Sequence, residues 1–225
     1  MGMVLGKIDV AEPAFDILFS RASCNVPYEV RSYGKRYAIE ASYKKGDDTG
    51  SPFRLLAQYI GVFGNPQNEG SASIAMTAPV IMESKKKDAN SGTPIAMTAP
   101  VVMSNDEGLA SKSMQFILPA EYDSMSKIPK PKNPGVTVKE LAPEVGVVHR
   151  YSGTYNDSKN EKMALKLRAQ LEEDGVSMSE EEVRNKYQFW GFNPPFTIPF
   201  MRRNEVFIAL TKSQVDDLMK NFKTA

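Results

Sequence analysis

The sequence predicts an α+β protein, a pseudo-twofold antiparallel β-barrel or curved sheet with two main helices outside and a short C-terminal helix. Three observations lead to this prediction. Short segments in which apolar and polar residues alternate recur along the chain, as in half-buried strands. Two other segments repeat apolar residues at helical spacing. The order strands, helix, strands occurs twice, at about 15–119 and 136–212, on either side of a proline-rich loop over 120–135.

Three alternating segments open the first half. Phe15 to Arg21 predicts one strand. Tyr28 to Tyr33 and Arg36 to Tyr43 predict two more, and because only Gly34 and its neighbour separate them, we predict a β-hairpin. One face of the third strand consists of Tyr37, Ile39, Ala41 and Tyr43.

A short helix is predicted after the polar loop KKGDDTG. Ser51 is expected to cap it, with Pro52 at the first helical position. Gly61 is placed to end it. Its single apolar face consists of Phe53, Leu56, Ala57 and Ile60.

The heptapeptide IAMTAPV occurs twice, at 74–80 and 95–101. The polar connector between the copies predicts two strands joined by an exposed loop. Because proline has no N–H to donate, Pro79 and Pro100 are expected at strand edges, bulges or strand ends. Met114 to Leu118 predicts the next strand.

The second half repeats this order. Strands are predicted over Val136 to Leu141, Val145 to Tyr151, Tyr187 to Phe192 and Glu205 to Thr211. The segment between the second and third of these strands predicts a helix, whose apolar face consists of Ala164, Leu167 and Leu171.

Local signals set the ends of this second helix. Ser158 and Glu161 form a capping box at its start, and Gly175 is placed to end it. Ser179 and Glu182 are spaced to cap one further short turn.

We expect one domain over residues 13–212, made of two similar halves, after a flexible N-terminus over residues 1–12. The tail, residues 213–225, predicts a short amphipathic helix. Its apolar residues are Val215, Leu218, Met219 and Phe222. Two interpretations stay open, since the helix either packs back onto the domain or binds a protein partner.

Charge and hydropathy exclude several functional classes. The chain has 28 basic and 27 acidic residues, so no overall field attracts nucleic acid or an anionic membrane. No window approaches the ~18 apolar residues of a transmembrane segment, and the N-terminus lacks the apolar stretch of a signal peptide. The single cysteine, Cys24, excludes an intramolecular disulfide. We therefore expect a cytoplasmic protein.

The residues do not indicate an enzyme. The chain has one histidine, His149, which limits catalytic and metal triads. No GxSxG, HExxH, Walker A or GxGxxG motif stands out. His149 is a candidate metal ligand because it is the strongest nitrogen ligand in the chain; a lone histidine on a strand is otherwise an ordinary packed or exposed residue.

Several strings occur in the order found in one known family. They are PYEVRSYGKRYAIEASY, FRLLAQYIG, the two IAMTAPV copies, MQFILP, PKPKNPGVTV, YQFWGFNPPF and RRNEVFIAL. Over residues 13–212 the chain resembles the SOUL haem-binding protein family, with the features of a plant-type cytosolic member. The IAMTAPV and RRNEV strings are the most specific parts of this resemblance.

The resemblance implies non-enzymatic binding of haem or another porphyrin in a hydrophobic groove beside the first helix, as a carrier or buffer. The cofactor-binding residues that it implies are Phe53, Arg54, Leu56, Ala57 and Ile60. The Arg54 guanidinium suits a haem propionate. On the residues alone, the apolar face of this helix can equally pack on the sheet.

An alternative is a protein-interaction module on the same fold without a physiological tetrapyrrole, with the C-terminal tail as its contact. Related haem binders carry further lysines on the first helix and before RRNEV, where this chain has Gln58 and Thr197. Arg202 and Arg203 are expected to form structural ion pairs with Glu205 or another acid rather than to hold a ligand.

Overall fold

The structure is a computed structural model of the chain, and it describes residues 5–44, 49–85, 111–194 and 196–223. Nine strands in these residues form one antiparallel sheet, in the order β1-β2-β7-β9-β8-β4-β5-β3-β6. Their bounds are β1 Phe15–Arg21, β2 Tyr28–Tyr33, β3 Arg36–Lys44, β4 Val80–Lys85, β5 Ser111–Ile117, β6 Thr137–Leu141, β7 Glu144–Tyr151, β8 Gln188–Gly191 and β9 Asn204–Ala209.

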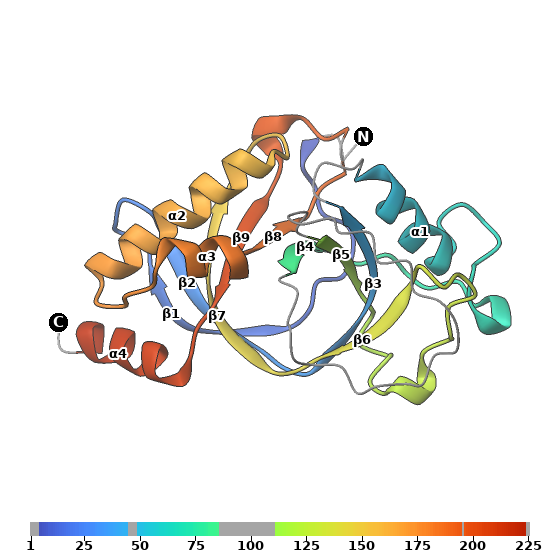
Figure 1. Ribbon diagram of the computed structural model, residues 1–225, viewed down its shortest axis with the longest axis horizontal. Helices are drawn as coiled ribbons and strands as arrows, with labels where there is room; N and C mark the ends of the chain where they lie inside the picture. Colours follow the sequence, from blue (N-terminus) through green and yellow to red (C-terminus); the bar gives the residue numbers. More distant parts are fainter. Residues whose placement is uncertain (1–4, 45–48, 86–110, 195, 224–225) are drawn as a thin grey trace, which may run out of the picture.

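The sheet is strongly curved but not closed, and β1 and β6 are its edges (Figure 1). The α+β class and the curved sheet are therefore confirmed, and the barrel alternative is not. The helices are α1 Gly50–Ile60, α2 Asp157–Glu173, α3 Glu180–Lys186 and α4 Lys212–Lys223, and short 3-10 turns are η2 Glu69–Ser71, η3 Met125–Lys127 and η4 Pro199–Met201.

The predicted hairpin of β2 and β3 is wrong, although both strands are present. β2 pairs with β1 and β7, whereas β3 pairs with β5 and β6. β2, from the first half of the sequence, therefore pairs with β7 of the second half. β6, from the second half, pairs with β3 of the first half. Gly34 and Lys35 join β2 and β3, which diverge after the turn. A local turn signal contains no information on the pairing of β2 with β7 or of β3 with β5, which are distant in sequence.

The two main helices cover the convex side of the sheet, as expected (Figure 1). α1 packs on β3 and β5, where Leu56 and Ile60 meet Ile39 and Phe116. α2 covers β2, β7 and β9 with Leu167 and other apolar residues. The outward faces of β3, β5, β7 and β9 are apolar because they lie under these two helices.

Two of the predicted helix caps are wrong. α1 begins at Gly50, so Ser51 lies in its first turn, where Pro52 is tolerated because the early N–H groups have no helical partner. At α2 the cap is Asn156, whose side chain accepts a hydrogen bond from the Lys159 amide at 3.0 Å. Asparagine and serine cap helices about equally well, so residue type alone does not distinguish Asn156 from Ser158 as the cap.

The other predicted helix ends are confirmed. Gly61 follows α1 in the left-handed region, with φ of 89°. Gly175 follows α2, with φ of 94°. The Ser179 hydroxyl accepts a hydrogen bond from the Glu182 amide at 3.0 Å and so caps α3.

The first IAMTAPV copy is mostly irregular rather than a strand. Val80 begins β4, and Pro79 lies directly before it, at the strand end where proline was expected. The Ala78–Pro79 peptide bond is cis. The second copy, 95–101 with Pro100, lies outside the described residues, so the predicted pair of strands stays a prediction there.

The described part of the predicted flexible N-terminus is instead held against the domain. Ala11 bridges Thr77 in parallel, and the Ala78 amide donates to the Ala11 carbonyl at 3.0 Å. Glu12 forms an ion pair with Arg203 at 2.9 Å. Residues 5–12 therefore complete the fold, because the unpaired edge of the first IAMTAPV copy offers backbone hydrogen bonds.

The C-terminal helix packs back onto the domain. Leu218 of α4 is fully buried in the cluster beneath α2. The Phe222 ring stacks on Phe19 of β1, with 5.0 Å between ring centroids. Two of the four apolar residues that predicted a tail helix are thus in contact with the core.

Candidate functional site

The apolar face of α1 is occupied by the sheet. Leu56 and Ala57 have no exposed surface, and Ile60 is 2% exposed. They pack against β3 and β5 because an apolar helix stripe is stabilised by covering the apolar side of a sheet. Three of the five residues implied as haem contacts therefore lie beneath the helix.

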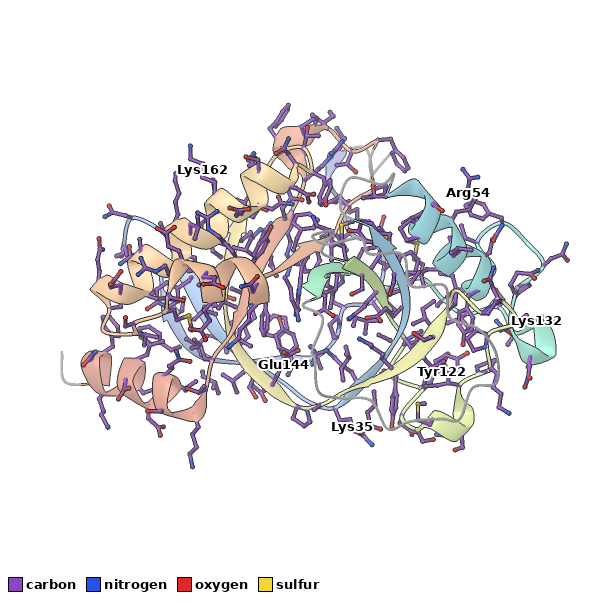
Figure 2. All side chains as sticks on the ribbon, viewed as in Figure 1. Lys35, Arg54, Tyr122, Lys132, Glu144 and Lys162 are labelled. Carbon is purple, nitrogen blue, oxygen red and sulfur yellow. The ribbon has the colours of Figure 1, made fainter. Side chains whose placement is uncertain are left out.

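The remaining two residues are accessible from outside. Phe53 is half-buried, and its ring meets Phe116 edge-on, 5.3 Å between centroids. Arg54 is exposed and extends from α1 away from the sheet (Figure 2). α1 thus presents the rim of an aromatic ring and one guanidinium to solvent.

Exposed apolar residues at the C-terminal end of α1 were missed. Val62 is 49% exposed and Phe63 is 63% exposed, directly after the helix-ending Gly61. The signal was present in the sequence, since two apolar residues follow a helix-ending glycine and are themselves followed by Gly64. Large apolar side chains gathered at one end of a helix are typical of a contact surface.

A second exposed group comes from the loop between β8 and β9. Phe196 is 63% exposed and Phe200 is 72% exposed. Met201 follows them and lies next to Gly6 of the N-terminal segment. The loop is held in place, because the Arg202 side chain donates to the Thr197 carbonyl at 2.8 Å. Its NPPFTIPF composition, rich in proline and phenylalanine, was the available signal.

Of the two arginines in the RRNEV string, Arg203 forms the predicted ion pairs, whereas Arg202 donates to the main-chain carbonyl of Thr197. Arg203 donates to Glu205 at 2.8 Å and pairs with Glu12. Glu205 is fully buried and also pairs with Arg31 at 2.9 Å. These guanidiniums are already engaged by carboxylates or by the main chain.

His149 lies on β7, on the side of the sheet that α2 covers. Its Nδ1 atom is 2.7 Å from the Pro27 carbonyl oxygen, and its ring stacks on Tyr151. Burial lowers the pKa of His149, partly offset by the Pro27 hydrogen bond. The carbonyl contact places the proton on Nδ1 in the neutral ring and leaves Nε2 as the acceptor.

The described residues contain no group of three or more His, Cys, Asp or Glu side chains arranged to hold a metal ion. Nor does any helix in that part of the chain have the length and apolar character needed to cross a bilayer.

Two hollows lie away from α1. One, of about 220 Å³, opens on the concave side of the sheet among β3, β4, β5, β6 and β8 and the turn after β6. The other, of about 370 Å³, lies between the start of β7, the end of β9 and α4. Neither is lined by the five residues that the resemblance implied.

Comparison with known families gives one match. The family described as SOUL heme-binding protein matches residues 10–94 and 84–209, which together span most of the chain. A search of curated protein sequences gives no significant match.

Comparison with solved structures supports the fold. The crystal structure of the EcmrR C-terminal domain is 12% identical, covers 84% of this chain and 99% of that chain, and has a TM-score of 0.51. A hydrolase encoded by lin2189 from Listeria innocua is 10% identical, covers 82% of this chain and 91% of that chain, and has a TM-score of 0.49. At 12% identity the likeness to the EcmrR domain concerns the fold alone.

Proposed function

Because the chain belongs to the SOUL heme-binding protein family, we propose that it binds haem or a related porphyrin reversibly, as a non-enzymatic carrier or buffer in the cytoplasm. The observation that carries this proposal is the family match over nearly the whole chain. Reversible binding agrees with a site at the surface rather than in a closed cavity.

The exposed surface of α1 is the proposed contact. Haem is a flat apolar disc with two propionates, so it needs apolar surface and a cation at its rim. Phe53, Val62 and Phe63 supply apolar surface, and Arg54 supplies a guanidinium for a propionate. Leu56, Ala57 and Ile60 contribute by fixing α1 on the sheet.

We propose that haem bound at α1 has no axial bond to His149. That residue lies on β7 under α2, whereas α1 lies on the part of the sheet formed by β3 and β5 (Figure 1). Replacing His149 with alanine is expected to leave the Soret maximum of bound haem unchanged.

The test is a titration of the purified protein with haemin. Arg54→Ala is expected to weaken haemin affinity about two- to fivefold, as for loss of an exposed ion pair. Lys162→Ala is the matched control, because Lys162 is an exposed cation on α2 (Figure 2). With protoporphyrin dimethyl ester, which lacks the propionate charges, Arg54→Ala is expected to have no effect.

A Soret band that does not shift at micromolar haemin, together with unchanged fluorescence from Trp190, would refute haem binding. Equal weakening by Arg54→Ala and Lys162→Ala would place the site elsewhere.

The second candidate function is a protein-interaction module on the same fold. The exposed Phe196 and Phe200 favour it, because large apolar side chains on a held loop are typical of interfaces. A pull-down that compares wild type with the double variant Phe196→Ser and Phe200→Ser tests this loop. A second comparison, with a chain ending at Thr211, tests the tail. Equal partner recovery from all three proteins contradicts the interaction module.

A further inference from the structure

The concave cavity of about 220 Å³ has a polar floor, and apolar as well as charged residues line it further out. The floor comes from three neighbouring strands, with Glu83 on β4, Gln115 on β5 and Gln188 on β8. The rim includes the exposed turn between β6 and β7, at Ala142 and Pro143. Figure 2 labels Glu144, another lining residue, on the concave side of the sheet.

Hydrogen bonds bind the floor into one network. Gln115 Nε2 donates to Glu83 at 2.9 Å and to Glu40 at 2.9 Å, so one amide group bridges two carboxylates. Gln188 Nε2 donates to Glu83 at 3.2 Å. Trp190 Nε1 donates to Gln188 at 2.8 Å. The only tryptophan of the chain is therefore two hydrogen bonds from Glu83.

In the part of the chain that the structure describes, no ion pair joins Glu83 to a cation around the cavity. Lys139 pairs with Glu40 at 2.6 Å, and Arg36 pairs with Glu144. Among the described residues, Glu83 receives hydrogen bonds only from neutral donors. A carboxylate turned toward a cavity and held by neutral groups favours a positively charged occupant.

A second feature of the floor points the same way. Gln115 is 3% exposed and lines the cavity. Its hydrogen bonds to Glu83 and Glu40 are both donated by Nε2, so Oε1 is the acceptor atom of this side chain. Glu83 and Gln115 thus both present acceptors, so the cavity fits a group that donates several hydrogen bonds.

The size of the cavity limits the occupant. Its volume is below the ~300–1,000 Å³ of pockets for drug-sized ligands, so a tetrapyrrole does not fit. Ile81 and Leu141 add apolar lining between floor and rim. The complement of this surface is a small aliphatic chain with a cationic donor at one end.

We propose that the concave cavity binds a small aliphatic ammonium compound, with the ammonium group between Glu83 and Gln115 and the alkyl chain toward Leu141 and Ala142. This site lies on the opposite side of the sheet from α1, so it goes beyond the proposed function and does not depend on it.

The test is a titration with n-butylammonium chloride, followed by the fluorescence of Trp190, in the absence of haem. The expected result is a saturable change with a dissociation constant on the order of 1 mM, since so small a ligand buries little surface. Sodium butyrate and 1-butanol are matched probes of the same chain length. Tighter or equal binding of butyrate or butanol overturns the proposal, as does a response to the amine that does not saturate.

Two sets of variants locate the site. Glu83→Gln is expected to weaken butylammonium binding about tenfold, whereas Glu69→Gln, which removes an exposed carboxylate on η2, leaves it unchanged. Ala142→Lys at the exposed rim is expected to weaken binding by repulsion, and Ala142→Glu is expected not to. The comparison of Ala142→Lys with Ala142→Glu tests whether the cavity binds the ammonium compound even if Glu83→Gln does not fold. Full affinity in Glu83→Gln, or equal effects of Lys and Glu at position 142, overturns the proposal.

Discussion

Glu205 lies at the centre of a buried ion network. It is fully buried and receives hydrogen bonds from Arg31 at 2.9 Å and from Arg203 at 2.8 Å. Each guanidinium is also held elsewhere, Arg31 by Glu29 and Arg203 by Glu12. The network joins β2, β9 and the N-terminal segment, which come from distant parts of the chain.

Removing the central charge is expected to be costly. Glu205→Gln leaves two buried guanidiniums facing one neutral amide, and we expect a loss of about 3–5 kcal/mol in the free energy of unfolding. Glu12→Gln removes a partly exposed partner, and we expect it to cost about 1 kcal/mol or less. Urea unfolding measures both. Similar losses from the two variants would contradict the central role of Glu205.

His149 makes stability depend on pH in a defined direction. Burial lowers its pKa below the ordinary value of 6.5, so the folded state disfavours the charged ring. A lowered histidine pKa means that the unfolded state binds the proton more readily, so stability is full above 6.5 and falls as the pH drops through the folded pKa.

We expect His149→Gln to show a smaller loss of unfolding free energy than wild type between about pH 7.5 and about pH 5. Because the chain has no other histidine, the difference between the two proteins reports on this residue. Identical pH profiles for the two proteins would show that burial does not shift its protonation.

Among the secondary structure elements, α2 depends on a cap that local pattern alone did not identify. The Asn156 side chain accepts the Lys159 amide, while Ser158 lies inside the helix. Asn156→Ala is therefore expected to cost about 1 kcal/mol, and Ser158→Ala to cost only a few tenths. Thermal or urea unfolding of the two variants checks this. The reverse order of effects would restore Ser158 as the cap.

The α1 helix shows why a helical pattern does not identify a binding site. Its apolar spacing predicted one buried face, and that face is buried. The spacing could not say whether sheet or ligand covers it, because both contacts are apolar. The proposed contact therefore moves to the outer surface of the same helix, at Phe53 and Arg54, and to Val62 and Phe63 directly after its end.

In the whole molecule, strand pairing between the two halves of the sequence holds the halves in one sheet. β2 pairs with β7 of the second half, and β6 pairs with β3 of the first half. When the halves are expressed separately, the pairings β2 with β7, β8 with β4 and β3 with β6 are all lost, and the unpaired strand edges favour aggregation.

We expect residues 1–135 and 136–225 to be unfolded or aggregated when expressed separately, and to regain the circular dichroism of the intact chain when co-expressed. The two-dimensional amide NMR spectrum of each fragment checks folding directly. A dispersed spectrum from either fragment alone would show that strand pairing with the other half is dispensable.

Local chemistry in the sequence determined most of the secondary structure. Eight of the predicted strands match described strands closely, and the helices follow their apolar spacing, because a half-buried element must alternate polarity with its own period. The ion pair of Arg203 with Glu205 was also predicted, since RRNEV places a cation two residues before an acid. The SOUL resemblance, carried by short strings, is confirmed by the family match.

Only the tertiary structure decided which strands pair and which surfaces stay open. The pairing of β2 with β7 joins residues more than a hundred positions apart, and no local turn signal encodes such a contact. The concave cavity likewise combines Glu83, Gln115 and Gln188, which are neighbours only across three strands. Alternation assigns a residue to a face of its own strand, but the partners on that face follow from the order and curvature of the whole sheet.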